Sequence, residues 1–131
     1  MRVLGIDYGS KRVGIALGDT ESKIATPWAT VPNEGSLALL ARIHELAARD
    51  QVEAIVVGVP RPLKNSKLEN QQVLETKTFI ASLRGIDLKV FEEDETLTSK
   101  LAARQVEERG EKGKRDDLAA ANILQTWLDK Q

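Results

Sequence analysis

The first third of the chain alternates between apolar and polar residues, which is the pattern of β-strands. Residues 2–9, RVLGIDYG, follow this pattern, and residues 11–19, KRVGIALGD, repeat it after a Gly-Ser turn. The two segments predict an antiparallel hairpin. Residues 23–31, KIATPWATV, predict a third strand at the edge of the sheet, where a proline is tolerated.

From residue 36 onwards, apolar residues recur at helical spacing and alternate with two further strands. Residues 36–50 start with Ser and predict a helix, and residues 53–60, EAIVVGVP, form the continuous apolar run of a buried parallel strand. Other helices are predicted at 70–85, 96–110 and 116–130, and another strand at 87–94. Hairpin strands followed by crossover units predict an α/β fold: a five-stranded mixed sheet with helices on both faces.

Composition narrows the class of protein. The chain has 131 residues and neither an internal repeat nor a linker, so one domain spanning 1–131 is expected. It has no cysteine, which excludes disulfides, thiolate zinc sites and a cysteine nucleophile, and fits a reducing cytoplasm. It contains neither a leader-like segment nor a run of roughly 20 apolar residues, so no membrane association is expected.

Asp7 is a lone charge at the end of the first predicted strand. The apolar alternation does not require a carboxylate there, and a buried one is costly unless it is hydrogen-bonded, paired or bound to a cation. Asp7 is therefore a candidate for chemistry. The alternative is that its side chain caps the turn at Gly9 and Ser10.

More acids stand at the ends of other elements. Residues 92–95, EEDE, end the last predicted strand, and Asp116 and Asp117 open the last helix. Because parallel strands end at the same edge of a sheet, these carboxylates are expected to converge with Asp7. The alternatives are a solvated strand end, favoured for Glu92 and Glu93 singly, and simple capping of the last helix.

Converging carboxylates repel one another unless cations lie between them. Ligation by oxygen alone favours Mg²⁺ or Mn²⁺. Two such ions, about 3.5–4 Å apart, activate a water and stabilise the leaving oxygen of a phosphodiester. The pattern therefore predicts metal-dependent hydrolysis of nucleic acid.

Four segments, in order, resemble the YqgF (RuvX) family of RuvC-like Holliday junction resolvases. They are GIDYGSKRVGIALGD, VVGVP, DETLTS and KGKRDDLAAANIL. The family is also described as the nuclease that matures the 5′ end of the 16S ribosomal RNA precursor. The resemblance implies an RNase H-like fold, which agrees with the element order expected from the residues.

The resemblance also implies roles for single residues. The metal-binding and catalytic acids would be Asp7, Glu95 and Asp116, and a basic pair after the first turn would be Lys11 and Arg12. The chain departs from the family at Thr96, where the family usually has Arg, and in residues 61–71, which lack the family's glycine. Both departures bear on how substrate is held.

A basic segment precedes Asp116. Residues 109–115, RGEKGKR, carry one acid, Glu111, against four cations: Arg109, Lys112, Lys114 and Arg115. The whole chain has a net charge of -1, so nucleic acid must be bound by such a local patch. These cations are expected to contact phosphates, together with Lys11 and Arg12. The alternative is an ordinary solvated loop.

The preferred function is a nuclease that processes the 5′ end of pre-16S rRNA. A nuclease acting on Holliday junctions, other branched DNA or single strands is the second candidate. An actin-like ATPase lobe would share the Asp-Gly-Ser turn, although such proteins need two lobes and this chain has one. A non-catalytic RNA-binding assembly factor is a further alternative. Both a monomer and a homodimer remain open.

Overall fold

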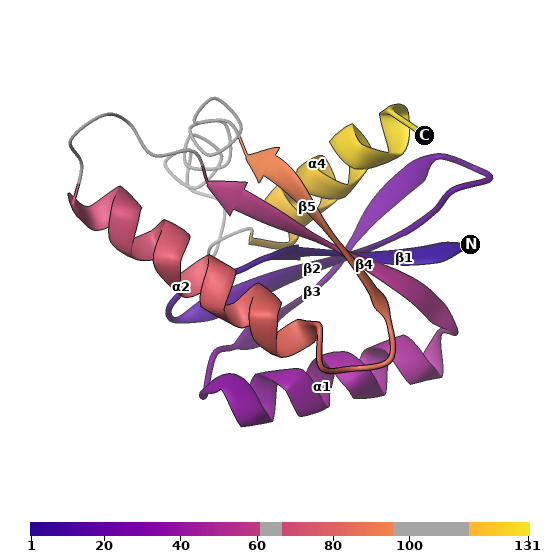
Figure 1. Cartoon of the computed structure of the whole chain (residues 1–131). Helices are drawn as coiled ribbons and strands as arrows, with labels where there is room; N and C mark the ends of the chain where they lie inside the picture. The colour runs from indigo at the N-terminus through magenta and orange to yellow at the C-terminus, as the bar shows by residue number, and fades with distance from the viewer. Residues whose placement is uncertain (61–66, 96–115) are drawn as a thin grey trace, which may run out of the picture.

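The computed structural model describes residues 1–60, 67–95 and 116–131 as a sheet covered by helices (Figure 1). The predicted helix at 96–110 lies outside the described residues. In chain order the elements are β1 (Arg2–Asp7), β2 (Arg12–Asp19), β3 (Ile24–Pro32), α1 (Ser36–Arg49), β4 (Val52–Pro60), α2 (Lys67–Leu83), β5 (Lys89–Glu95) and α4 (Asp116–Asp129).

The five strands form one mixed sheet in the order β3-β2-β1-β4-β5. β2 is antiparallel to both β1 and β3, whereas β4 is parallel to both β1 and β5. Helices α1 and α2 cover one face and α4 covers the other (Figure 1). The predicted mixed sheet with helices on both faces is thereby confirmed. None of the helices in the described part of the chain has the length and apolar character needed to cross a membrane.

Most bounds differ from the prediction by one or two residues, and the largest shift is at the start of α2. Helix α2 begins at Lys67, three residues before the predicted start at Asn70. Residues 67–69, Lys-Leu-Glu, are good helix formers, so the helix extends into a segment whose polar composition favoured a loop.

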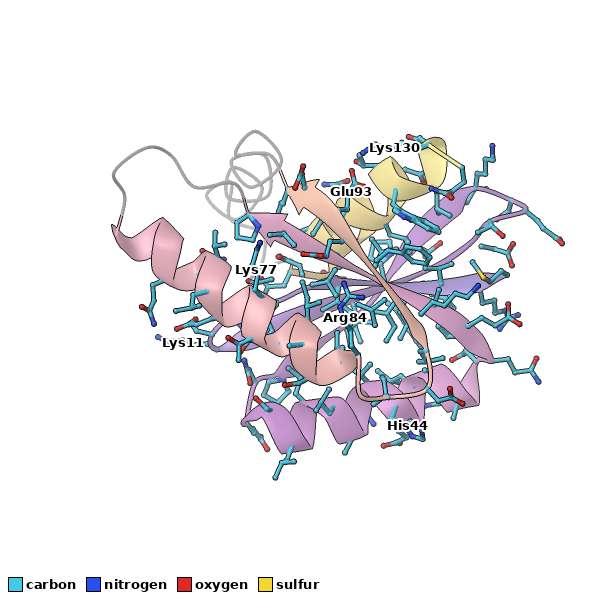
Figure 2. The ribbon with its side chains drawn as sticks, in the orientation of Figure 1. Lys11, His44, Lys77, Arg84, Glu93 and Lys130 are labelled. Atoms are coloured by element: carbon cyan, nitrogen blue, oxygen red, sulfur yellow. The ribbon has the colours of Figure 1, made fainter. Side chains whose placement is uncertain are left out.

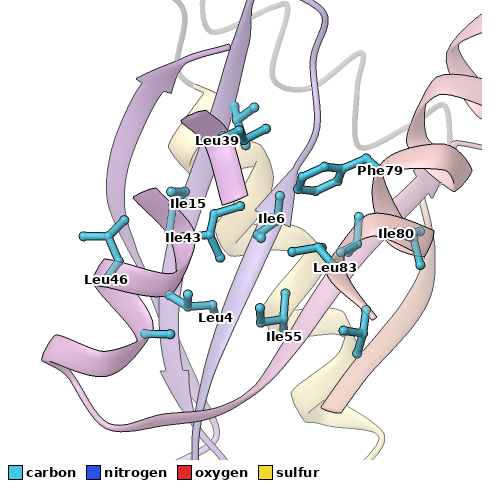
Figure 3. Packing of buried hydrophobic residues seen from close by; sticks show 14 of the residues in the cluster. Leu4, Ile6, Ile15, Leu39, Ile43, Leu46, Ile55, Phe79, Ile80 and Leu83 are labelled. Carbon is cyan, nitrogen blue, oxygen red and sulfur yellow. The ribbon is translucent and has the colours of Figure 1, made fainter. Parts of the chain in front are cut away.

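The larger core lies between the sheet and helices α1 and α2 (Figure 3). Leu4 and Ile6 of β1 belong to this core, whereas Val3 belongs to the second core beneath α4. Successive side chains of a strand point to opposite faces, so the odd-numbered residues of β1 face α4. Asp7 therefore lies on the α4 face, at the carboxyl edge of the sheet.

Helix α4 approaches the sheet closely because glycines line the strands beneath it. A Cβ on Gly5 would lie 2.6 Å from Leu124 Cβ, and one on Gly58 would overlap Ile123 Cδ1. A Cβ on Gly14 would overlap the backbone carbonyl oxygen of Asp116. The first turn of α4 can therefore rest on β2 only where β2 has no side chain.

We expect Gly14→Ala to destabilise the chain by at least about 3 kcal/mol, because the new methyl group meets rigid backbone. Gly18→Ala is the matched control on the same face of β2. Its Cβ would meet the flexible ends of Leu124 and Leu128 at 2.9 and 3.0 Å, and the backbone carbonyl oxygen of Ile24 only at 3.1 Å, so we expect a smaller loss of about 1–2 kcal/mol. Urea unfolding of both variants measures the difference, and equal losses would contradict the close seating of α4 on Gly14.

Candidate active site

Asp7 is half-buried at the end of β1, directly opposite Gly14 of β2 in the antiparallel ladder. Facing residues of a ladder project from the same side of the sheet, about 4.5–5.5 Å apart at Cβ. The space that a side chain on Gly14 would fill is occupied by the backbone of Asp116. The sheet register therefore brings the first residue of α4 beside Asp7.

Asp116 lies beside a positive charge from β2. Its Oδ2 atom lies 3.6 Å from Nε of Arg12, and this oxygen is inaccessible to solvent. The two side chains are 38% (Arg12) and 24% (Asp116) exposed, so the pair is partly screened and contributes less than about 1 kcal/mol. Its main effect is to place a positive charge at the acidic edge of the sheet.

Glu95 is the third acid at this edge, and it is 4% exposed. It follows Phe91 and Glu93 at two-residue intervals along β5, and these two contact Trp127 and Lys130 at the end of α4 and just beyond it. Glu95 therefore shares the α4 face. Its Oε2 would lie 3.4 Å from a Cβ on Gly58, so the carboxylate extends over β4, which separates β5 from β1.

The other glutamates of the strand end have separate partners; Figure 2 labels Arg84, Glu93 and Lys130. Glu92 is exposed and lies 3.4 Å from Nη2 of Arg84, as expected for a solvated position. Glu93 was expected to be solvated as well, but that prediction is wrong, because Glu93 is 6% exposed and pairs with Lys130. The C-terminal end of α4 supplies a cation that makes burial of this carboxylate tolerable.

The three acids share an edge and a face of the sheet without forming a preassembled ligand cluster. Among the residues that the structure describes, no three His, Cys, Asp or Glu side chains are grouped so that they could hold a metal ion. The available donors are nevertheless carboxylate oxygens, which are the ligands that hard divalent cations prefer. The residue types and their positions fit such a cation, which would have to draw the side chains together.

Two of the predicted nucleic-acid contacts fall within the described residues. Lys11 is exposed in the turn between β1 and β2 (Figure 2), and Arg12 begins β2 in contact with Asp116. The remaining predicted contacts lie outside the described residues, and so does Thr96. They are Arg109, Lys112, Lys114 and Arg115.

Pattern-based reasoning missed Asn33, which contacts the turn after Asp7. Its Nδ2 donates a hydrogen bond to the Gly9 carbonyl at 2.8 Å, and its backbone N–H donates one to the Lys11 carbonyl at 2.9 Å. The only local signal was a Pro-Asn pair after β3, which is typical of ordinary turns.

Comparison with known sequences identifies relatives along the whole chain. The model of the RuvX family, described as Holliday junction resolvase, matches residues 1–130. A relative from Sulfurihydrogenibium sp. (strain YO3AOP1) is 35% identical over 135 residues, which are 98% of this chain and 90% of the relative. One from Bacteroides thetaiotaomicron is 39% identical over 139 residues, which are 99% and 97% of the two chains. Both carry the provisional name of a pre-16S rRNA nuclease.

Solved structures of resolvases share the fold. RuvC of T. thermophilus in complex with a Holliday junction substrate matches with a TM-score of 0.62 and 17% identity, covering 99% of this chain and 95% of RuvC. The fowlpox virus Holliday junction resolvase matches with a TM-score of 0.60 and 14% identity over 100% of both chains. At these identities the likeness concerns the fold alone, and it confirms the expected RNase H-like architecture.

The family and the names of its members agree on one class of chemistry. They indicate a nuclease, which is a hydrolase of phosphodiester bonds, and such families depend in general on divalent metal ions. The likeness at the sequence level extends over residues 1–130, which include Asp7, Glu95 and Asp116. This chain belongs to the RuvX family.

Proposed function

We propose that this nuclease processes the 5′ end of pre-16S rRNA in the cytoplasm, using Asp7, Glu95 and Asp116 to hold Mg²⁺ or Mn²⁺. One observation carries the metal assignment: acids from β1, β5 and α4 lie at the same edge and on the same face of the sheet. The RNA assignment is supported by the names of the relatives from Sulfurihydrogenibium sp. and Bacteroides thetaiotaomicron.

The surroundings of the acids suit this role. Oε2 of Glu95 and Oδ2 of Asp116 are inaccessible to solvent, so both oxygens lie where the attraction of a cation is weakly screened. Two bound ions would supply an activated water and stabilise the leaving oxygen of the phosphodiester. Arg12, beside Asp116, limits the negative charge that the acids bring to an approaching phosphate.

Nucleic acid would be held by the cations around this edge. Lys11 is exposed one residue before Arg12, within the turn that follows Asp7. The segment 109–115 immediately precedes Asp116 in the sequence. Its four cations would therefore contact phosphates next to the acids. Contacts of this kind hold the backbone of the substrate without selecting its sequence.

Branched DNA is the second candidate substrate. It is favoured by the description of the family model as Holliday junction resolvase. The same acids would serve either polymer, since phosphodiester chemistry at the metal does not depend on the sugar. Testing both polymers as substrates side by side therefore distinguishes the two candidates.

We expect Asp7→Asn to reduce cleavage to background while the fold persists, because an amide fills the same volume but binds a hard cation poorly. Asp19→Asn is the matched control, since Asp19 also ends a strand but lies opposite Arg2 in the β1–β2 ladder, at the other end of the sheet. Wild type and both variants are incubated with labelled precursor RNA, four-way junctions and linear single strands, in Mg²⁺ and in Mn²⁺.

The outcomes separate the candidate functions. Cleavage of precursor RNA by wild type and Asp19→Asn supports the proposal, and full activity of a purified Asp7→Asn protein contradicts the site. Preferential cutting of junctions favours branched DNA as the substrate. Tight RNA binding without cleavage favours an assembly factor, and ATP hydrolysis without nuclease activity favours an ATPase.

We expect Asp116, rather than Asp117, to bind the cation. Successive helical residues point about 100° apart, so both can hardly face the same ion, and the match to the family motif KGKRDDLAAANIL selects Asp116. Asp116→Asn is expected to lose cleavage and the stabilisation by Mn²⁺, which amounts to about 2.7 kcal/mol for wild type at about 100 times Kd. Asp117→Asn is expected to keep both. Thermal melts with and without Mn²⁺ measure this, and the reverse pattern would exchange the two roles.

A further inference from the structure

The turn between β1 and β2 is held by a residue that is remote in sequence. Asn33, in the connection from β3 to α1, donates hydrogen bonds to the carbonyls of Gly9 and Lys11 at 2.8 and 2.9 Å. The carbonyl oxygen of its own side chain accepts a hydrogen bond from the N–H of Gly35 at 3.2 Å. One side chain and one backbone amide thus connect the start of α1 to this turn.

The two hydrogen bonds of the side-chain amide define its orientation. The oxygen must face the N–H of Gly35, and the nitrogen must face the carbonyl of Gly9. If the amide were rotated by half a turn, its nitrogen would face the N–H of Gly35, donor against donor. Its oxygen would face the carbonyl oxygen of Gly9, acceptor against acceptor. An aspartate could accept the hydrogen bond from Gly35, but its second oxygen would face the carbonyl oxygen of Gly9.

The turn that Asn33 holds is tight and connects several groups of the site. A Cβ on Gly9 would overlap the carbonyl oxygen of Arg12, so the chain has little room to follow another path. Tyr8 stacks on Phe79 of α2 with ring centroids 4.6 Å apart, and Arg12 lies 3.6 Å from Asp116. A shift of the turn would therefore move Arg12 and the residues next to Asp7.

We propose that Asn33 is a positioning residue, which holds the turn so that Asp7 and Arg12 keep their places beside Asp116. The inference deepens the proposed function and rests on it for the role of the acids. Asn33 is half-buried, and its hydrogen bonds go to backbone groups of the turn and of Gly35, so it is not a catalytic residue. It acts through the two carbonyls that it binds.

The test compares Asn33→Ala and Asn33→Asp with wild type. The alanine removes the side-chain bonds without adding charge, and the aspartate adds repulsion from the Gly9 carbonyl. Asn122→Asp is the matched control, because Asn122 is exposed on α4 and the change in charge is the same. Three quantities are measured: backbone ¹⁵N order parameters of residues 9–11, Mn²⁺ affinity from thermal shifts, and kcat and KM on the cleaved substrate.

Both Asn33 variants are expected to loosen the turn, with order parameters falling from about 0.85 towards 0.6. Loss of one hydrogen bond corresponds to roughly a five- to tenfold loss of Mn²⁺ affinity and of kcat, with KM changed less. Asn33→Asp should show the larger effect, and Asn122→Asp should resemble wild type.

Two results would overturn the positioning role. One is order parameters equal to those of wild type in both Asn33 variants. The other is a loosened turn with unchanged Mn²⁺ affinity and kcat, which would make the contact merely structural. If wild type cleaves none of the substrates, the proposed function fails by itself, and the order parameters together with the Mn²⁺ affinity still decide the role of Asn33.

Discussion

The close seating of α4 on the sheet is the constraint on which the rest of the site depends. Gly5, Gly14 and Gly58 leave room for the helix where any side chain would collide with it. Because the helix begins directly over Gly14, no side chain separates its first residue from the sheet. That residue therefore lies next to Asp7. The same seating brings Trp127 onto Phe91 and Lys130 onto Glu93 at the other end of the helix.

Charge balance is the second requirement of this arrangement. Glu93 and Glu95 are both almost fully buried on the α4 face, and Asp7 and Asp116 lie at the same edge. Lys130 balances Glu93, and Arg12 lies beside Asp116. Lys130 and Arg12 therefore reduce the repulsion among the carboxylates on this face of the folded domain.

The turn after Asp7 contributes both to the contact with α4 and to the charge balance. It carries Arg12 towards α4, it packs Tyr8 against α2, and it is held from behind by Asn33. Elements on both faces of the sheet therefore contact the few residues next to Asp7. Contacts on both sides limit how far this turn can shift while the acids nearby repel one another.

Much of the fold follows from local patterns in the sequence. Alternation predicts β1 and β2, and the continuous apolar run predicts β4, because these strands are half or fully buried. Asp7 stands out because a charge in an apolar strand is costly. Burial of Glu93 could not be predicted, since it depends on Lys130, 37 residues away. The role of Asn33 likewise depends on a contact across 24 residues, and Gly14 resembles any strand glycine until α4 is placed over it.

The most direct test of the account is to locate bound Mn²⁺ by its paramagnetic broadening of backbone amide signals, which falls steeply with distance. Substoichiometric Mn²⁺ is added to ¹⁵N-labelled wild-type protein. The account predicts that signals of Asp7, Gly14 and Asp116 disappear first, while those of Arg2 and Asp19 at the opposite edge persist. Uniform broadening, or loss that starts around Asp19, would contradict a metal site built from Asp7, Glu95 and Asp116.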